Sequence, residues 1–164
     1  MYPLIKQLKE GLDPSPYRLW YNDWVIKNAH GNILDVGKST LWDYGVPTFD
    51  INSDLKPTYV GNIEKTDFKD SEFDVVLCNG LYETVDNPQK MIDEVTRISK
   101  LAIFGFVGKD YKPYRKPWKF YEGKETFPLL YAPTDFGKEY HFIIWKRERY
   151  IQLSLTIRID PEMT

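Results

Sequence analysis

The segment from Phe73 to Ile98 constrains the fold of this chain more than any other. Residues 73–78 form an almost continuous apolar run, which is typical of a strand buried on both faces of a parallel sheet. After a polar loop, Asp86 is a suitable N-cap for a helix that has Pro88 in its first turn. Apolar residues then recur along one helix face, at Met91, Ile92, Val95 and Ile98. A buried strand followed by an amphipathic helix predicts an α/β fold.

Further short runs have the character of strands. They span residues 32–37, 47–51, 58–61, 101–107, 140–146 and 151–159. The last of these alternates apolar and polar residues, as a half-exposed strand does, and Arg147 to Arg149 would form a hairpin turn before it. We therefore expect a mostly parallel seven-stranded sheet with a C-terminal antiparallel hairpin.

Other segments complete the expected organisation of one domain over residues 1–164. Residues 1–16, rich in proline, predict a loose arm or a short helix. A helix is expected from Tyr17 to Asn28, with Ser15 or Pro16 at its start. Lys38 to Tyr44 leaves room for barely two helical turns. Residues 108–140, which begin with interleaved aromatic and basic residues, are expected to cover a substrate site.

Composition excludes several classes of protein. The net charge of −2 argues against a generic binder of polyanions, and a single cysteine, Cys78, excludes an internal disulfide. Cys78 lies in an apolar run, where a free cysteine usually acts as a small buried hydrophobe. The chain shows neither a signal peptide nor an apolar stretch of about 20 residues, so we expect a soluble cytoplasmic protein.

Small and polar residues recur where the predicted strands end. They are Asp35 and Gly37, then Asp50, then Asn62, and finally Asn79 and Gly80. Ligands of open parallel sheets bind beyond the carboxyl ends of the strands. A carboxylate after the second strand can accept hydrogen bonds from both hydroxyls of a ribose, and a glycine after the first strand allows close approach to the backbone. Each residue alone could instead cap a helix or form a turn.

Residues 32–100 resemble the class I S-adenosylmethionine-dependent methyltransferases, most closely the small-molecule, methyltransferase-11-like branch. The matching residues are Leu34-Asp35-Val36-Gly37, Asp50-Ile51, Gly61-Asn62-Ile63-Glu64, Glu72-Phe73-Asp74-Val75-Val76 and Glu94-Val95-Thr96-Arg97. The segment from Gly61 to Arg97 is the specific part. This resemblance implies a Rossmann-like, doubly wound fold, S-adenosylmethionine as the cofactor, and no metal.

The resemblance also implies roles for particular residues. Asp50, with Ile51 beside it, would hold the ribose hydroxyls, and Asn62 and Ile63 would contact adenine. Asn62 replaces the usual aspartate, but its carbonyl oxygen can still face the exocyclic amine. The cofactor-binding residues expected on this basis are Asp35, Gly37, Asp50, Ile51, Asn62, Ile63, Asn79 and Gly80.

The first loop departs from the family pattern D-x-G-x-G-x-G. Gly37 is kept, whereas Lys38 and Ser39 add side chains where the backbone normally lies against the cofactor. Gly37-Lys38-Ser39-Thr40 also looks like the end of a phosphate-binding loop, but that motif requires glycine at position 32, which is Asn32.

The remaining residues leave the acceptor open. Tyr82 could position a substrate, and Glu83 or His141 could act as a base, although His141 could equally be an ordinary strand residue. The sequence favours a methyltransferase acting on a small molecule. The alternatives are a catalytically inactive binding module with an eroded cofactor loop and, more weakly, a nucleic-acid binder that uses the basic and aromatic residues after Gly108. Exposed edges of the C-terminal strands could pair with a second copy as a homodimer.

Overall fold

The computed structural model describes residues 5–8, 14–112, 116–128, 131–136 and 138–147. Its centre is a seven-stranded sheet with the order β5-β4-β2-β6-β7-β9-β8. The strands are β2 (Ile33–Val36), β4 (Thr48–Asp50), β5 (Tyr59–Val60), β6 (Phe73–Asn79), β7 (Ser99–Val107), β8 (Tyr131–Phe136) and β9 (Tyr140–Lys146). The first five are parallel to one another, while β9 is antiparallel to both β7 and β8. The predicted fold class is confirmed.

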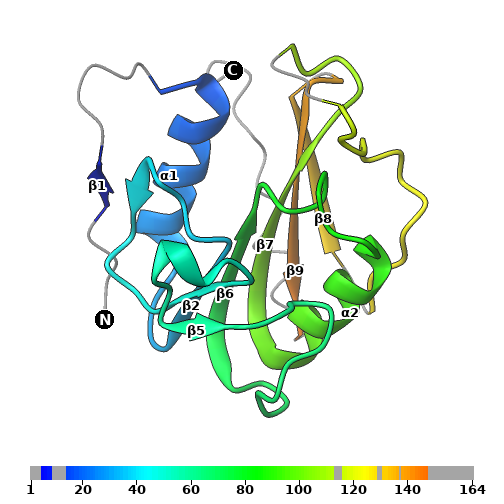
Figure 1. Ribbon diagram of the computed structural model, residues 1–164. Helices are drawn as coiled ribbons and strands as arrows, with labels where there is room; N and C mark the ends of the chain where they lie inside the picture. The colour runs from blue at the N-terminus through cyan, green and yellow to red at the C-terminus, as the bar shows by residue number, and fades with distance from the viewer. Residues whose placement is uncertain (1–4, 9–13, 113–115, 129–130, 137, 148–164) are drawn as a thin grey trace.

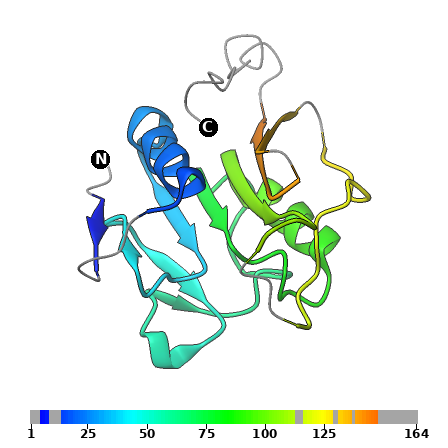
Figure 2. The ribbon, with the colours of Figure 1, turned by 90° about the horizontal axis from the view of Figure 1, so that it is seen from above.

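One α-helix covers each face of the sheet in the described part of the chain (Figure 1, Figure 2). Helix α1 (Pro16–Asn28) begins at the predicted cap, since the Ser15 hydroxyl accepts a hydrogen bond from Arg18 N. Helix α2 (Pro88–Ile98) buries its apolar stripe on the opposite face. Alternation along the strands divides the core accordingly: Val75 and Leu77 pack on the α1 side, and Val76 and Cys78 pack on the α2 side.

Two predicted helix features are wrong in detail. The cap of α2 is Asn87 rather than Asp86, because Pro88 occupies the first helical position and the Asn87 side chain accepts from Lys90 N at 3.1 Å. The expected short helix over residues 38–44 is absent. Instead Trp42–Asp43 forms a strand, β3, paired with β1 (Lys6–Gln7), which lies in the region predicted as an arm or helix. Two helical turns are too short to be stable without packing.

The C-terminal hairpin is formed by β8 and β9. The sequence predicted β9 but assigned residues 131–136 to the substrate cover, because Tyr-Ala-Pro-Thr-Asp-Phe lacks alternation and contains Pro133. Proline is tolerated there because β8 is the outermost strand of the sheet. The predicted strand over residues 151–159 and the turn at 148–149 lie outside the described residues.

Strand order reverses beside β2, with β4 and β5 on one side and β6 and β7 on the other. The carboxyl ends of β2, β4 and β6 therefore meet at a topological switch point, where α/β sheets bind ligands. No helix in the described residues is both long and apolar enough to cross a membrane.

Candidate functional site

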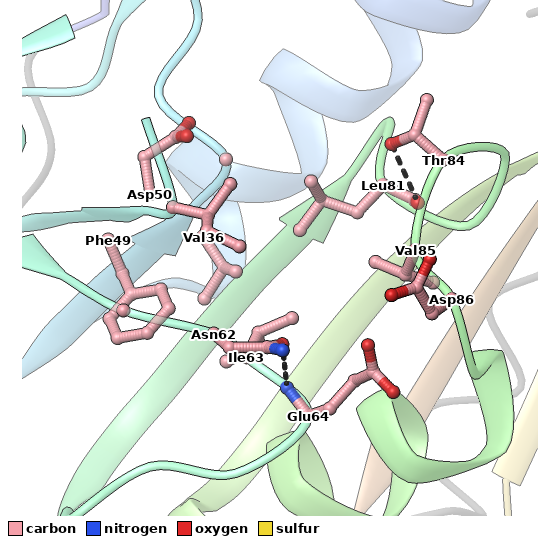
Figure 3. A pocket seen from close by; sticks show the side chains of 13 residues that line it. Val36, Phe49, Asp50, Asn62, Ile63, Glu64, Leu81, Thr84, Val85 and Asp86 are labelled. Carbon is pink, nitrogen blue, oxygen red and sulfur yellow. Dashed lines mark hydrogen bonds between the residues drawn. The ribbon is translucent and has the colours of Figure 1, made fainter. Parts of the chain in front are cut away.

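A cleft opens beyond the carboxyl ends of β2 and β4 and has a volume of about 200 Å³. It is lined by Val36, Gly37, Phe49, Asp50, Ile51, Gly61, Asn62, Ile63, Glu64, Leu81, Thr84, Val85 and Asp86. Figure 3 shows Val36, Phe49 and Asp50 on one side and Leu81, Thr84 and Val85 on the other. Five of the eight predicted cofactor residues line it, namely Gly37, Asp50, Ile51, Asn62 and Ile63.

Asp50 is held at the mouth of the cleft by two backbone hydrogen bonds. One carboxylate oxygen accepts from Lys38 N at 2.8 Å and the other from Asn52 N at 2.9 Å. Each oxygen can accept a further hydrogen bond, because a carboxylate has about four acceptor sites. The side chain can therefore fix the preceding loop and still bind two ligand hydroxyls.

Gly37 forms the narrow end of the cleft. Its φ of +84° favours glycine, and a Cβ there would lie 3.1 Å from Leu81 Cδ2. Its N–H donates to Phe49 O at 2.8 Å, which ties the loop to the end of β4. A side chain at this position would therefore be strained in its backbone conformation and would press against Leu81.

The opposite end of the cleft combines an exposed amide with an apolar wall. Asn62 is exposed, and its side-chain oxygen accepts from Glu64 N at 2.9 Å, as drawn in Figure 3. Ile63 is buried at 5% exposure, whereas Ile51 is 71% exposed at the rim. An apolar surface beside polar groups is suited to a planar heterocycle.

The side chains of Lys38 and Ser39 lie outside this cleft. Lys38 Nζ donates to Lys56 O at 3.0 Å, and Ser39 Oγ accepts from Leu41 N and Trp42 N. Both line a separate pocket instead. The two side chains that the sequence adds to this loop therefore do not fill the cleft, and the turn in which Ser39 accepts two backbone hydrogen bonds lies on the side of the other pocket.

Asp35 also lines that separate pocket, because successive residues of β2 face opposite sides and Val36 takes the cleft side. Asp35 is 6% exposed. Burial raises its pKa to about 8, although the Arg18 charge opposes this shift. The structure does not bring Asp35 together with Asp50 in the cleft.

The other two predicted cofactor residues lie outside the cleft lining: Asn79 is the last residue of β6, and Gly80 follows it. The Asn79 side-chain oxygen accepts a hydrogen bond from the Tyr140 hydroxyl and lies directly over Gly105. Gly80 has a φ of +81°, and its turn directs the next residue, Leu81, into the cleft.

The three candidate catalytic residues lie in different surroundings. Tyr82 is buried on the α2 side, and its hydroxyl donates to Glu125 at 2.5 Å. His141 is half-buried on the same side, with its ring 5.2 Å from that of Tyr121, which also contacts Tyr82. Glu83 is separate from both.

Glu83 is 8% exposed, and one of its carboxylate oxygens, Oε2, is buried without a hydrogen-bond partner. Burial raises its pKa. Burial is the largest cause that raises the pKa values of Tyr111 and Tyr140, and the negative charge of Glu83 is the second. The Glu83 backbone oxygen accepts from Lys119 N at 3.1 Å, next to Trp118, whose ring stacks on that of Tyr111.

Sequence reasoning missed several lining residues of the cleft. Val36 and Phe49 belong to predicted strands, and their cleft-facing positions follow from the alternation next to Gly37 and Asp50. Thr84, Val85 and Asp86 lie in the loop after β6, where no periodicity indicates direction. The Glu94-x-x-Arg97 motif lies outside the cleft: Glu94 binds Arg97 and the Thr66 hydroxyl.

Comparison with known proteins agrees with this topology. Residues 39–101 match the family described as the methyltransferase domain. An uncharacterized protein of Methanocaldococcus jannaschii is 40% identical over 82 residues, which cover 41% of this chain and 40% of that protein. The chain thus spans less than half the length of this curated relative.

Solved structures share the fold at low sequence identity. A methyltransferase of Thermotoga maritima, described as S-adenosylmethionine-dependent and as a possible histamine N-methyltransferase, has a TM-score of 0.55 at 15% identity and covers 80% of this chain and 97% of its own. A protein of Pyrococcus horikoshii has a TM-score of 0.54 at 16% identity and covers 80% of this chain and 91% of its own. The chain has the fold of the class I S-adenosylmethionine-dependent methyltransferases and carries a methyltransferase-domain segment, so the resemblance found in the sequence is confirmed.

The described residues contain no group of three or more acidic, histidine or cysteine side chains placed to hold a metal ion.

Proposed function

We propose that this protein binds S-adenosylmethionine in the cleft and transfers its methyl group to a small-molecule acceptor. The observation that carries the proposal is the course of the loop after β2. Its two unexpected side chains, Lys38 and Ser39, point into another pocket, while Gly37 and Asp50 remain on the cleft. The proposed site therefore keeps the geometry expected of a cofactor cleft without the usual three glycines.

The residues at the wide end fit a nucleoside. Asp50 would accept hydrogen bonds from the ribose hydroxyls, and Ile63 would provide an apolar surface for adenine. Asn62 would face the base with an amide, which can accept and donate at once. When bound, the cofactor supplies an activated methyl group. The chain then needs chiefly to align an acceptor beside it.

A calorimetric titration with S-adenosylmethionine and with S-adenosylhomocysteine tests the proposal. We expect micromolar binding by the unaltered protein and at least a tenfold loss in Asp50→Ala, because two ligand hydroxyls lose their acceptor. Asp67→Ala is the matched control, since Asp67 is exposed and lies outside the cleft. Equal affinity of the Asp50 and Asp67 variants would contradict the proposal.

Asp50 also fixes the backbone of Lys38 and Asn52, so its loss could open the loop rather than remove a ligand contact. Ser39→Ala separates these effects. It removes the hydroxyl that accepts from Leu41 N and Trp42 N but leaves Asp50 in place. We expect Ser39→Ala to reduce affinity by less than Asp50→Ala does.

A second candidate, a non-catalytic binding module, is favoured by the narrow end of the cleft. The Leu81 side chain packs against Gly37, and the volume of about 200 Å³ lies below the roughly 300–1,000 Å³ of most ligand pockets. Absence of binding by the unaltered protein at millimolar S-adenosylhomocysteine would support this candidate.

A further inference from the structure

Glu83 presents a buried carboxylate without a counter-ion in the described structure. One oxygen, Oε2, is buried without a hydrogen-bond partner, and in the described residues neither a lysine nor an arginine forms a salt bridge with it. An ionised carboxylate that is held away from water destabilises the folded protein unless a cation or hydrogen-bond donors compensate its charge. Among the residues that the structure describes, the site therefore lacks a positive partner.

The carboxylate lies beside the turn that follows β6 and borders the cleft. A Cβ at Gly80 would be 3.8 Å from Glu83 Oε1, so this oxygen lies close to the turn after β6. The neighbouring residues Leu81 and Thr84 line the cleft itself. Glu83 thus lies behind the same turn whose other side borders the cofactor cleft.

Four aromatic rings pack together on this side, and we call them the aromatic cluster: Tyr17, Tyr111, Trp118 and Tyr140. Tyr17 stacks on Tyr140 with ring centres 5.3 Å apart, and Tyr111 stacks on Trp118 at 6.2 Å. Tyr111 also meets Tyr140 edge-on at 5.9 Å. Glu83 lies beside this cluster, because its backbone oxygen accepts a hydrogen bond from Lys119 N at 3.1 Å, directly after Trp118. In agreement with this position, the Glu83 charge also raises the pKa values of Tyr111 and Tyr140.

Two nearby cations are engaged elsewhere. The Lys119 ammonium donates to Val85 O, while the Lys119 backbone N–H donates to Glu83 O. The second cation is the Arg18 guanidinium. It donates to the Tyr44 hydroxyl at 2.6 Å and lies over the rings of Tyr21 and Trp42, at 5.4 and 5.7 Å from their centres. Arg18 therefore leaves Glu83 Oε2 available to a ligand.

We propose that Glu83 and the aromatic cluster bind the protonated nitrogen of an amine, so that the methyl acceptor is an amine. This inference rests on the proposed methyltransferase function. Aromatic faces attract cations through the ring quadrupole, and a carboxylate adds a charge-assisted hydrogen bond.

The same carboxylate can also prepare the nitrogen for reaction. A proton on the bound ammonium can pass to Glu83 Oε2, which leaves a neutral amine with its lone pair and a protonated carboxyl group. Burial raises the pKa of Glu83 and makes it a stronger base than an exposed glutamate.

The test uses phenethylamine, which is a cation at pH 7, and 2-phenylethanol, its neutral analogue of similar shape. Binding to the unaltered protein is followed by amide chemical shifts, with and without S-adenosylhomocysteine. We expect saturable binding of phenethylamine and at least tenfold weaker binding of 2-phenylethanol.

Variants then locate the site. Glu83→Gln keeps the shape but removes the charge, and we expect at least a tenfold loss of phenethylamine affinity. Glu125→Gln is the matched control, since Glu125 also has a buried, unpartnered carboxylate oxygen but lies beside Tyr82 on the other side of the sheet. Tyr111→Leu should weaken binding several-fold, whereas Tyr111→Phe should restore it because the aromatic face is retained.

The outcomes separate this inference from the proposed function. Equal binding of the amine and the alcohol, an unaffected Glu83→Gln, or absence of saturable phenethylamine binding would each overturn the amine site. If the amine binds as expected while S-adenosylhomocysteine does not bind, the amine site stands and the methyltransferase proposal fails.

Discussion

Two glutamates of similar burial occupy opposite chemical surroundings. Glu83 is 8% exposed and Glu94 is 9% exposed. Glu94 accepts hydrogen bonds from Arg97 and from the backbone and hydroxyl of Thr66, which together outweigh burial and hold its pKa below the usual range. Glu83 has an unpartnered oxygen, and burial raises its pKa.

The comparison shows how partners, rather than burial, distinguish a structural acid from a candidate site. The Glu94 cluster joins α2 to the loop before β6, and its charges are satisfied within the chain. The Glu83 carboxylate, by contrast, needs a bound cation to compensate its charge.

Loss of the satisfied acid should cost most. We expect Glu94→Ala to lower the free energy of unfolding by about 2 kcal/mol, because Arg97 and Thr66 lose their acceptor. The difference from the unaltered protein should shrink as pH falls below the ordinary pKa of 4.5, since a lowered folded-state pKa contributes stability only above that range. Urea denaturation between pH 3 and 7 measures it.

Asp93→Ala is the control for that substitution. Asp93 lies on the same helix and is exposed, and its side chain accepts a hydrogen bond from the Gln89 side chain at 2.9 Å. We expect a change within about 0.5 kcal/mol. Equal losses for the Asp93 and Glu94 variants would break the comparison.

Asp35 extends the contrast to an aspartate whose pKa is raised by burial to about 8. A folded-state pKa above the unfolded value means that stability is present in full below pH 3.8 and is lost as pH rises through 8. We expect Asp35→Asn to be more stable than the unaltered protein by about 1.5 kcal/mol at pH 9, since the neutral amide avoids the buried charge. Thermal unfolding at pH 5 and pH 9 checks this, and an unchanged difference between the two would contradict it.

Glu83→Gln should behave in the same sense with a smaller effect. Its raised pKa means that the unaltered protein loses stability as pH rises from 4.5 through the folded-state value. We expect the variant to gain about 1 kcal/mol at pH 7, the order of the cost of an unpartnered buried polar group, and nothing at pH 4. Urea denaturation at both pH values tests it; a loss of stability at pH 7 would show that Glu83 is satisfied within the chain.

Asp74 gives the smallest expected effect, because its partners are exposed to water. It accepts from Asn32 N at 2.8 Å and pairs with Lys100 at 3.1 Å, and these bonds lower its pKa, but its side chain is 42% exposed. We expect Asp74→Ala to cost about 0.5 kcal/mol, in the range of surface pairs. The loss should diminish in 1 M salt, where such pairs are screened. A loss of stability as large as that of Glu94→Ala would mean that the exposure of the bonded groups does not determine the size of the loss.

The strand pattern could be predicted because burial on both faces leaves a continuous apolar run. Residues 73–78 and 101–107 are such runs, and both became central strands. Residues 131–136 could not be predicted, since an edge strand beside β9 needs neither alternation nor a second apolar face. The helix predicted over residues 38–44 was wrong for a related reason. The pairing between Trp42 and Gln7 is a long-range contact, which local propensity does not reveal.

The cleft residues also divide into those that the sequence predicts and those that it does not. Asp50 and Asn62 follow strands directly, so their place at one sheet edge follows from chain order. Asp35 also ends a strand, yet it faces a different pocket from Val36 because side chains alternate. Which of the two residues faces the ligand depends on which side of the sheet is covered by α1, and the sequence does not state this.

The sequence by itself determined the α/β class, the segments that form the parallel strands and the residues at their carboxyl ends, because periodicity and apolar character are local properties of the chain. Only the tertiary structure decided that Lys38 and Ser39 turn from the cleft, that Glu94 is paired, and that Glu83 is not. These differences arise from contacts between residues far apart in sequence. Desolvation and hydrogen bonding act through space, so neither the charge state nor the availability of a buried side chain can be assigned before its neighbours are known.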